Sequence, residues 1–214
     1  MVLSKERAQL VATLHDMGSA QLSPGASGNA SVKTADGGIL ISATGQVAAN
    51  ARPADLVYIS PDGHIDERQL KPSSEWRMHW QIYQDHPNAG GVVHCHSRYA
   101  TVLACQRREI PAFHYMVAVA GGDSIPCAPY ALYGSQELSL LVSHALQNRK
   151  ACLLANHGQI AYGSDPVKAL ALAKEVEALA ANYFFSLQNG GPTLLSEQEM
   201  NDVLAQYVNY GRQK

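Results

Sequence analysis

The sequence predicts a single α/β domain over residues 1–214, with a sheet that begins antiparallel and then alternates with helices. Three observations support this fold class. A chain that is 46% hydrophobic and 16% charged can bury a substantial core within the size of one large domain. Short apolar runs in the first third are separated by turn residues typical of hairpins. Later apolar runs of strand length alternate with longer helical stretches.

The first third of the chain predicts one helix followed by three strands. Ser4 is a candidate N-cap for a helix with an apolar stripe from Leu10 to Met17, ended by the Ser23-Pro24-Gly25 stretch. Turn residues at 36–38 and 61–63 bound the strands that follow. These strands are expected over Ala30 to Lys33, Ile39 to Ser42 and Leu56 to Ser60.

Helices and strands alternate in the rest of the chain, and each predicted helix has a recognisable start. Ser73 or Ser74 can cap a helix to about Asp85, and Ser135 can open one to about Leu146. Asp165 and Pro166 form an N-cap and N1 pair for an Ala-rich helix to about Gln188. Ser196 and Glu199 have capping-box spacing for a last helix toward Tyr210. Strands are expected over Gly91 to His96 and Ala151 to Ala155, and a turn-rich connection over Ala120 to Tyr130.

Three histidines at strand ends predict a metal site. His94 and His96 are two residues apart after an apolar run, so a strand would project both from one face. His157 follows a second apolar run. Three imidazoles with an open position are the usual provision for catalytic zinc, whereas structural zinc is closed by four ligands, most often thiolates. The alternative is that strand histidines only make hydrogen bonds or face solvent.

Glu75, expected at the start of a helix, offers a carboxylate that can ligate the ion or act as a base. The alternative is a helix-dipole partner worth ~0.3–1 kcal/mol that needs no metal. The remaining histidines have no matching spacing and are expected to be structural or on the surface. They are His15, His64, His79, His86, His114 and His144.

Small and hydroxyl residues at predicted turns suit a phosphate group. Hydroxyls and backbone N–H groups at a helix N-terminus hold an anion without an arginine. For each residue taken alone, a plain turn or cap is the favoured interpretation, and only the combination beside Glu75 favours an anion site. The candidates are Gly28 and Asn29 after Ser27, Thr44 with Gly45, and Ser73 with Ser74.

Tyrosines are candidate proton donors, although most tyrosines pack with a satisfied hydroxyl. The three considered are Tyr115, Tyr133 and Tyr210. A formal net charge of −2 without long basic runs argues against binding nucleic acid or anionic membranes. Scattered cysteines and the absence of a secretory signal at the start fit a reduced cytoplasm. A small-molecule substrate is therefore expected.

These motifs together resemble the class II aldolase/adducin family, in particular its branch of bacterial L-fuculose-1-phosphate aldolases. The resemblance spans nearly the whole chain, and its most discriminating part lies between Ile110 and Tyr130. It departs at Asn156, where a histidine is expected, at Tyr133, where a phenylalanine is expected, and in a short tail after Tyr210. The matching motifs are Gly28-Asn29, Thr44-Gly45, residues 72–77, 92–96, 110–116, 120–130 and 148–151, His157-Gly158 and Tyr210-Gly211.

The resemblance implies a three-layer α/β/α fold with a central, predominantly antiparallel sheet. It also implies a homotetramer with active sites at subunit interfaces and one Zn²⁺ per subunit, held by the three histidines. Glu75 would be a resting ligand that becomes the catalytic acid/base, and Tyr115 and Tyr210 would come from a neighbouring subunit. The six small and hydroxyl residues would bind the substrate phosphate. They are Gly28, Asn29, Thr44, Gly45, Ser73 and Ser74.

The expected function is that of a lyase: reversible cleavage of a ketose 1-phosphate, L-fuculose 1-phosphate, into dihydroxyacetone phosphate and L-lactaldehyde. The alternatives on the same scaffold are an L-ribulose-5-phosphate 4-epimerase and a methylthioribulose-1-phosphate dehydratase. A Schiff-base aldolase would need a desolvated lysine, and only Lys150 stays open as one. A non-catalytic adducin-like module would lack the metal ligands, which this sequence retains.

Overall fold

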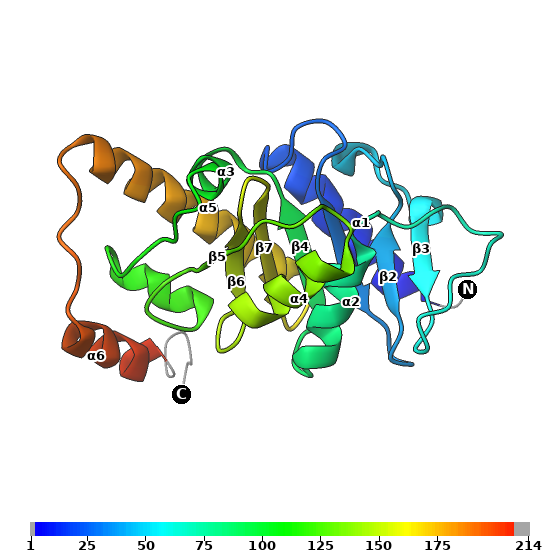
Figure 1. The fold of residues 1–214 in the computed structure, drawn as a ribbon. Helices are drawn as coiled ribbons and strands as arrows, with labels where there is room; N and C mark the ends of the chain where they lie inside the picture. Colours follow the sequence, from blue (N-terminus) through cyan, green and yellow to red (C-terminus); the bar gives the residue numbers. More distant parts are fainter. Residues whose placement is uncertain (1–2, 208–214) are drawn as a thin grey trace.

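Residues 3–207 of the computed structural model are described, and within them seven strands form one sheet in the order β3-β2-β1-β4-β7-β6-β5 (Figure 1). The strands are β1 (Asn29–Lys33), β2 (Ile39–Ser42), β3 (Leu56–Ile59), β4 (Gly91–Cys95), β5 (Cys127–Ala128), β6 (Ala151–Leu154) and β7 (Gly158–Gly163). The helices are α1 (Ser4–Ser19), α2 (Trp76–Asp85), α3 (Arg98–Cys105), α4 (Gln136–Ala145), α5 (Pro166–Gln188) and α6 (Glu197–Tyr207). Short 3₁₀ segments are η1 (Ala48–Asn50), η2 (Pro53–Asp55) and η3 (Tyr115–Ala120).

The sheet is mixed, which corrects the expectation of a predominantly antiparallel one. β5 pairs parallel with β6, whereas the other five pairings are antiparallel. The parallel pair follows from connectivity, because α4 carries the chain from the end of β5 back to the start of β6. β5 lies in the segment expected to be only a turn-rich connection.

Helices cover both faces of the sheet (Figure 1). The alternation of side chains along each strand separates two apolar cores. Leu40 and Val93 belong to the core that also contains α1, α3 and α5, whereas Ile41 and Val92 belong to the core that contains α2 and α4. Each central strand is therefore buried on both faces.

The helix starts agree with the sequence in three cases and differ in two. The Ser135, Asp165 and Ser196 side chains accept hydrogen bonds from backbone N–H groups three residues later, as capping requires. The first helix instead has Leu3 as its N-cap, so Ser4 is already helical. Likewise α2 begins at Trp76 with Glu75 as N-cap, two residues beyond Ser73.

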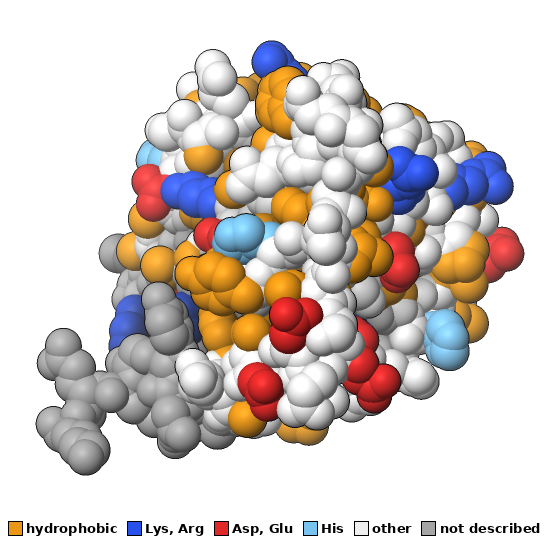
Figure 2. All heavy atoms as spheres, turned by 90° about the vertical axis from the view of Figure 1, so that its left-hand side faces the viewer, with side chains coloured by type: hydrophobic (Ala, Val, Ile, Leu, Met, Phe, Trp, Pro, Cys, Tyr) orange, Lys and Arg blue, Asp and Glu red, His pale blue; other side chains and the backbone are white. Residues whose placement is uncertain are grey.

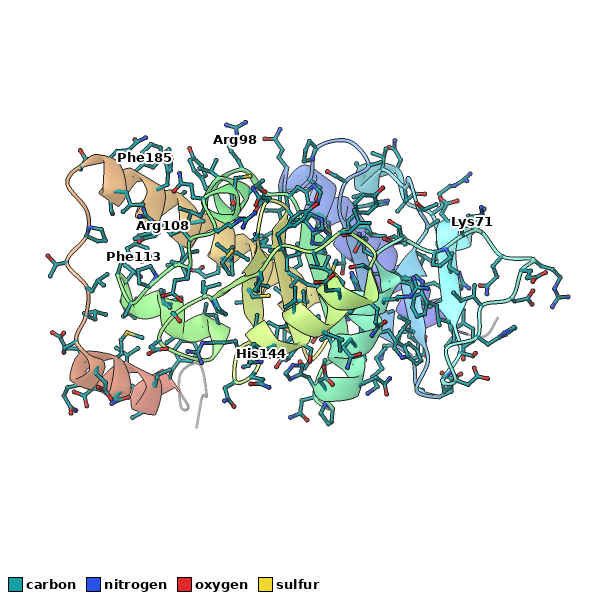
Figure 3. The ribbon with its side chains drawn as sticks, viewed as in Figure 1. Lys71, Arg98, Arg108, Phe113, His144 and Phe185 are labelled. Carbon is teal, nitrogen blue, oxygen red and sulfur yellow. The ribbon has the colours of Figure 1, made fainter. Side chains whose placement is uncertain are left out.

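Aromatic packing anchors the segment that carries η3 to the C-terminal part of α5. The Phe113 ring centroid lies 5.2 Å from that of Tyr183 in α5. On the same part of α5, the Phe185 ring centroid lies 5.5 Å from that of Tyr99 in α3. Figure 3 shows Phe113 and Phe185 on this side of the molecule. The η3 segment is thereby held on the scaffold although Tyr115 at its start is exposed.

No helix within residues 3–207 is long and apolar enough to cross a membrane.

On the face drawn in Figure 2, hydrophobic side chains gather around an exposed histidine, and Lys and Arg side chains lie apart from one another.

Candidate active site

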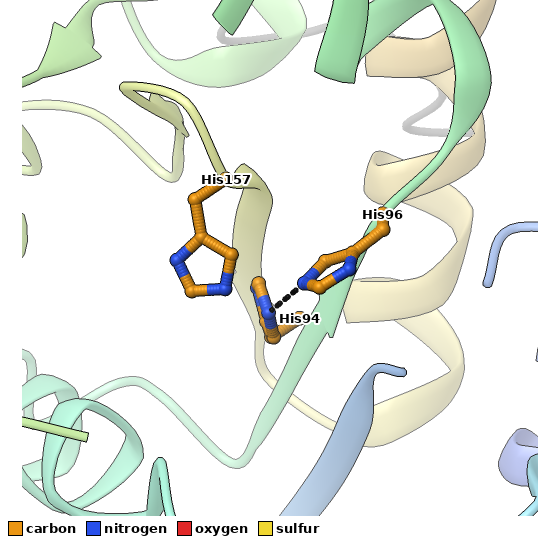
Figure 4. Close-up of side chains that lie close together, drawn as sticks. All are labelled: His94, His96 and His157. Atoms are coloured by element: carbon orange, nitrogen blue, oxygen red, sulfur yellow. Dashed lines mark hydrogen bonds between the residues drawn. The ribbon is translucent and has the colours of Figure 1, made fainter. Parts of the chain in front are cut away.

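The three predicted histidines converge at one end of the sheet (Figure 4). His94 lies in β4, His96 follows that strand, and His157 lies in the tight turn between β6 and β7. One ring nitrogen from each lies within 4.8 Å of the others, and His94 Nε2 is 3.1 Å from His96 Nε2. The antiparallel pairing of β4 with β7 brings these segments together across the sheet.

His94 is oriented to present its Nε2 lone pair. Its Nδ1 lies 2.8 Å from the carbonyl oxygen of Gln159, and since a carbonyl can only accept, Nδ1 is the donor. In the neutral ring the proton is then on Nδ1 and Nε2 is free to ligate. The ring is fully buried, so this orientation is fixed by the β4–β7 pair.

Glu75 completes the histidine cluster. Its Oε1 lies 3.1 Å from His157 Nε2 and its Oε2 lies 3.2 Å from His94 Nε2. Ligand atoms around a tetrahedral zinc with bonds of about 2.0–2.1 Å are about 3.3–3.4 Å apart, so this nitrogen and oxygen set fits one ion. Glu75 is held here as the N-cap of α2, with its backbone N–H directed to Ser73 Oγ at 3.3 Å.

Electrostatic interactions with neighbouring histidines keep the Glu75 carboxylate charged. Burial alone would raise the pKa of Glu75, but His94 and His157 beside it hold that pKa far below its ordinary value. Burial and the neighbouring imidazoles lower the pKa of His96 to about 4. Metal ligation requires an ionised carboxylate and neutral imidazoles, and the lowered pKa values of Glu75 and His96 favour this state for those two groups.

A cavity of about 340 Å³ lies against this cluster. All six residues predicted to bind phosphate line it together with Glu75, His96 and His157; the six are Gly28, Asn29, Thr44, Gly45, Ser73 and Ser74. Gly28 has φ +101°, and a Cβ there would lie 2.2 Å from Ser23 Oγ and 3.0 Å from the His94 carbonyl oxygen. The Gly28 backbone therefore lies closer to Ser23 and to the His94 carbonyl oxygen than a residue with a Cβ would allow.

Of the candidate tyrosines within the described residues, one lines the cavity and the other does not. Tyr133 lines the cavity, and so does Tyr130, which the sequence did not single out. Tyr115 does not line the cavity and is 52% exposed at the start of η3. Tyr210 lies outside the described residues. Asn156, one of the departures from the family pattern, lines the cavity and accepts a hydrogen bond from Arg107 Nε at 3.0 Å.

Sequence reasoning missed one group near the site. His79, expected to be structural or on the surface, is fully buried and lies 2.6 Å from Asn29 Oδ1 through its Nε2. The Asn29 amide nitrogen in turn donates to Glu75 Oε2 at 2.9 Å. The available signal was spacing, because a residue four positions after Glu75 lies on the same helix face.

Burial of His79 predicts acid sensitivity of the fold. Burial lowers the pKa of His79 to about 3, so between the ordinary value of 6.5 and about 3 the unfolded chain binds a proton that the folded chain does not. The free energy of unfolding should fall as the pH falls through this window, by up to about 1.4 kcal/mol per pH unit. Denaturant unfolding at about pH 7 and about pH 5 should show a weaker dependence for His79→Gln than for the parent. Equal dependence would refute this assignment.

The model of the class II aldolase and adducin N-terminal domain matches residues 8–184. The chain belongs to the class II aldolase and adducin family. Class II aldolases are metal-dependent, in agreement with the candidate metal site formed by His94, His96 and His157.

Members of the class II aldolase and adducin family resemble the chain over most of its length. A Rhodospirillum rubrum protein named 5-methylthioribulose-1-phosphate/5-deoxyribulose-1-phosphate aldolase is 48% identical, over 89% of this chain and 85% of that protein. The L-fuculose phosphate aldolase of Escherichia coli K12 is 44% identical, over 99% and 98%. A solved L-fuculose 1-phosphate aldolase aligns with a TM-score of 0.91 at 34% identity, covering 97% of this chain and 98% of that one. The expectation of a lyase is confirmed, because these relatives are aldolases.

Proposed function

We propose that the chain is a zinc-dependent aldolase that reversibly cleaves a ketose 1-phosphate, L-fuculose 1-phosphate, into dihydroxyacetone phosphate and L-lactaldehyde. The single observation that carries the proposal is the position of Glu75. Its carboxylate touches His94 and His157 and also lines the cavity that contains Ser73 and Ser74. One group thus lies within reach of both a metal and a bound phosphorylated chain. We further propose that residues 1–214 form one domain.

His94, His96 and His157 would hold the zinc ion, with Glu75 as a fourth ligand in the resting site. Zinc accepts this combination of imidazole and carboxylate ligands. When bound, it would supply a Lewis acid for the negative charge that develops when a carbon–carbon bond next to a carbonyl breaks.

The chain's own residues would position the substrate and move the protons. Hydroxyl and N–H groups of the Ser73–Ser74 and Thr44–Gly45 turns would bind the phosphate. On cleavage of the C3–C4 bond its electron pair stays with C3, and the C4 hydroxyl loses its proton through Tyr115 to solvent as the aldehyde forms. Glu75, after taking one proton from solvent, delivers it to C3, so that no net proton is gained or lost. In synthesis Glu75 removes that proton and Tyr115 donates one to the aldehyde oxygen. Tyr210 is the second tyrosine that we propose for this active site.

A second substrate is favoured by a specific observation. The relative at 48% identity is named for 5-methylthioribulose 1-phosphate and 5-deoxyribulose 1-phosphate. Cleavage of either would release the same dihydroxyacetone phosphate and a different aldehyde. Tyr130, Ala131 and Tyr133 also line the cavity, and their apolar surfaces suit an aldehyde ending in a methyl or thioether group.

The deciding experiment incubates zinc-loaded protein with L-fuculose 1-phosphate, 5-deoxyribulose 1-phosphate and 5-methylthioribulose 1-phosphate. Release of dihydroxyacetone phosphate is measured for each, and kcat/KM ranks them. In a parallel incubation with L-ribulose 5-phosphate, inversion at C4 would indicate the epimerase. Loss of water from methylthioribulose 1-phosphate without dihydroxyacetone phosphate would indicate the dehydratase, and no reaction with any of them would refute the aldolase.

Ser74→Ala should weaken binding of dihydroxyacetone phosphate by about tenfold, because a hydroxyl hydrogen bond to a charged group contributes about 1.5 kcal/mol. Ser74 suits this test since its side chain is exposed in the cavity, whereas Ser73 is buried and also receives the Glu75 N–H. Calorimetry measures the affinity, with Ser143→Ala on α4 as control. Unchanged affinity would place the phosphate elsewhere.

We also propose a homotetramer whose active sites are completed across subunit interfaces by Tyr115 and Tyr210. In support, large hydrophobic side chains remain exposed in the isolated chain, among them Tyr115, Leu132 at 61% and Tyr133 at 64%. Exposed patches of this kind mark interaction surfaces.

Mixing Glu75→Gln subunits with Tyr115→Phe subunits should then restore part of the activity that each has lost. The reason is that a mixed interface can combine an intact Glu75 with an intact Tyr115. Activity is measured after subunit exchange has been verified by mass spectrometry. If exchange occurs and activity stays absent, both groups act within one chain.

A further inference from the structure

A row of buried polar side chains leads from Glu75 into the core between α2 and β1. We call Asn29, His79, Ser31 and Tyr83 the polar row. Asn29 Nδ2 donates to Glu75 Oε2 at 2.9 Å, and Asn29 Oδ1 lies 2.6 Å from His79 Nε2. Ser31 Oγ lies 2.8 Å from His79 Nδ1 and 2.8 Å from the Tyr83 hydroxyl oxygen. None of the four side chains belongs to a residue more than 4% exposed.

The polar row results from the regular spacing of side chains along β1 and along α2. Asn29 and Ser31 are two residues apart in β1 and share one face of that strand. His79 and Tyr83 follow Glu75 at intervals of four along α2 and share one helix face. Two polar stripes therefore meet inside an otherwise apolar core that includes Met78 and Ile82.

The donors and acceptors along the row are all determined. Because Asn29 gives its amide nitrogen to the carboxylate, its Oδ1 faces His79 and must accept, so the imidazole proton is on Nε2. Nδ1 then accepts from the Ser31 hydroxyl, and Ser31 Oγ accepts from Tyr83. Burial lowers the pKa of His79 to about 3, which keeps the ring neutral and consistent with one donor and one acceptor.

His79 is the group that holds the Asn29 amide in place from the side away from Glu75. Without it, Asn29 Oδ1 would be a buried acceptor with no donor, a costly state that rotation of the Asn29 side chain away from its present position would relieve. Such a rotation would withdraw the N–H that now fixes Glu75 Oε2. The backbone of Asn29 would stay in place, because β1 pairs with β4 opposite His94.

We propose that His79 is a positioning residue for catalysis: its Nε2–H fixes the Asn29 amide, and this amide fixes the Glu75 carboxylate in its reactive orientation. The proposal rests on the proposed role of Glu75 as the acid/base. It adds a fully buried histidine to the residues on which turnover depends, and it requires the Nε2–H tautomer.

The kinetic test compares His79→Leu and His79→Gln in zinc-loaded protein. His79→Leu should lower kcat about 10- to 100-fold, as removal of outer partners of metal ligands does, with KM within about threefold of the parent. His79→Gln keeps an N–H near the position of Nε2 and should recover most of the lost kcat. His86→Leu is the matched control, because His86 ends the same helix and contacts Tyr162 but has no link to Glu75.

Zinc content and thermal midpoint are measured for each variant so that loss of structure is separated from loss of positioning. Folded, zinc-loaded His79→Leu with the kcat of the parent would overturn the proposal. So would equal losses of kcat in the leucine and glutamine variants at equal zinc content, because the N–H would then not matter.

A second measurement needs neither a folded leucine variant nor aldolase activity. In the zinc-loaded parent with ¹⁵N-labelled histidine, nuclear magnetic resonance identifies which His79 nitrogen bears the proton, and His79→Gln assigns the signal by its disappearance. A proton on Nε2 supports the proposal, and a proton on Nδ1 overturns it. If the parent cleaves no ketose 1-phosphate, the proposed function fails, while the tautomer still reports on the polar row.

Discussion

Glu75→Gln should reduce kcat by about 10²- to 10⁴-fold, the usual contribution of a general acid or base, while the fold is retained. The amide can still offer an oxygen to the metal and accept from Asn29, but it can neither take nor return the C3 proton. The direct measurement is exchange of the C3 proton of dihydroxyacetone phosphate with solvent deuterium. This exchange does not require an aldehyde, so it separates proton transfer at C3 from the carbon–carbon bond step.

The matched control for this substitution is Glu137→Gln. Glu137 lies exposed in the first turn of α4, so the variant loses the same charge without contact to the cavity. Its exchange rate should equal that of the parent. If Glu75→Gln also exchanges deuterium at the parental rate, another group is the base.

Removing one imidazole of the cluster should abolish both metal binding and turnover. His94→Ala is the most severe choice, because His94 is fully buried and its ring contacts Glu75, His96 and the Gln159 carbonyl oxygen. Loss of one zinc ligand leaves too few donors for tight binding. Elemental analysis should give one zinc per parental subunit and close to none in the variant, and a chelator should inactivate the parent until zinc is returned.

His144→Ala serves as the control for the metal experiment. His144 is exposed on α4 (Figure 3), so its loss should change neither zinc content nor activity. Full activity of the parent in excess chelator, with no transition metal found by analysis, would contradict the metal site.

The sequence alone predicted the first three strands, α5 and the convergence of the three histidines, because local signals determine them. Alternating apolar residues, turn glycines and the Asp165–Pro166 pair act within a few neighbours. The grouping of His94, His96 and His157 needed only the rule that strand ends at one edge lie close together. Glu75 was proposed as a ligand or base from its expected place at a helix start, and the family resemblance added the role of a resting ligand that becomes the acid/base.

Elements that depend on distant partners were not predicted. α3 is capped by Glu177, whose carboxylate accepts the N–H groups of Tyr99 and Ala100 from almost eighty positions away. β7 contains the buried Gln159, which interrupts an apolar pattern and is tolerated because its amide donates to Ser97 and to the Ala173 carbonyl. Such tertiary hydrogen bonds leave no local trace in the sequence.

The division of the interior into two cores determines how the protein unfolds and loses activity on heating. β4 supplies Val93 and Cys95 to one core and Val92 to the other, and the same strand carries His94. Melting of either core would release this strand and with it the histidine cluster. Inactivation and global unfolding should therefore occur as one cooperative transition, with no partly melted species that still turns over.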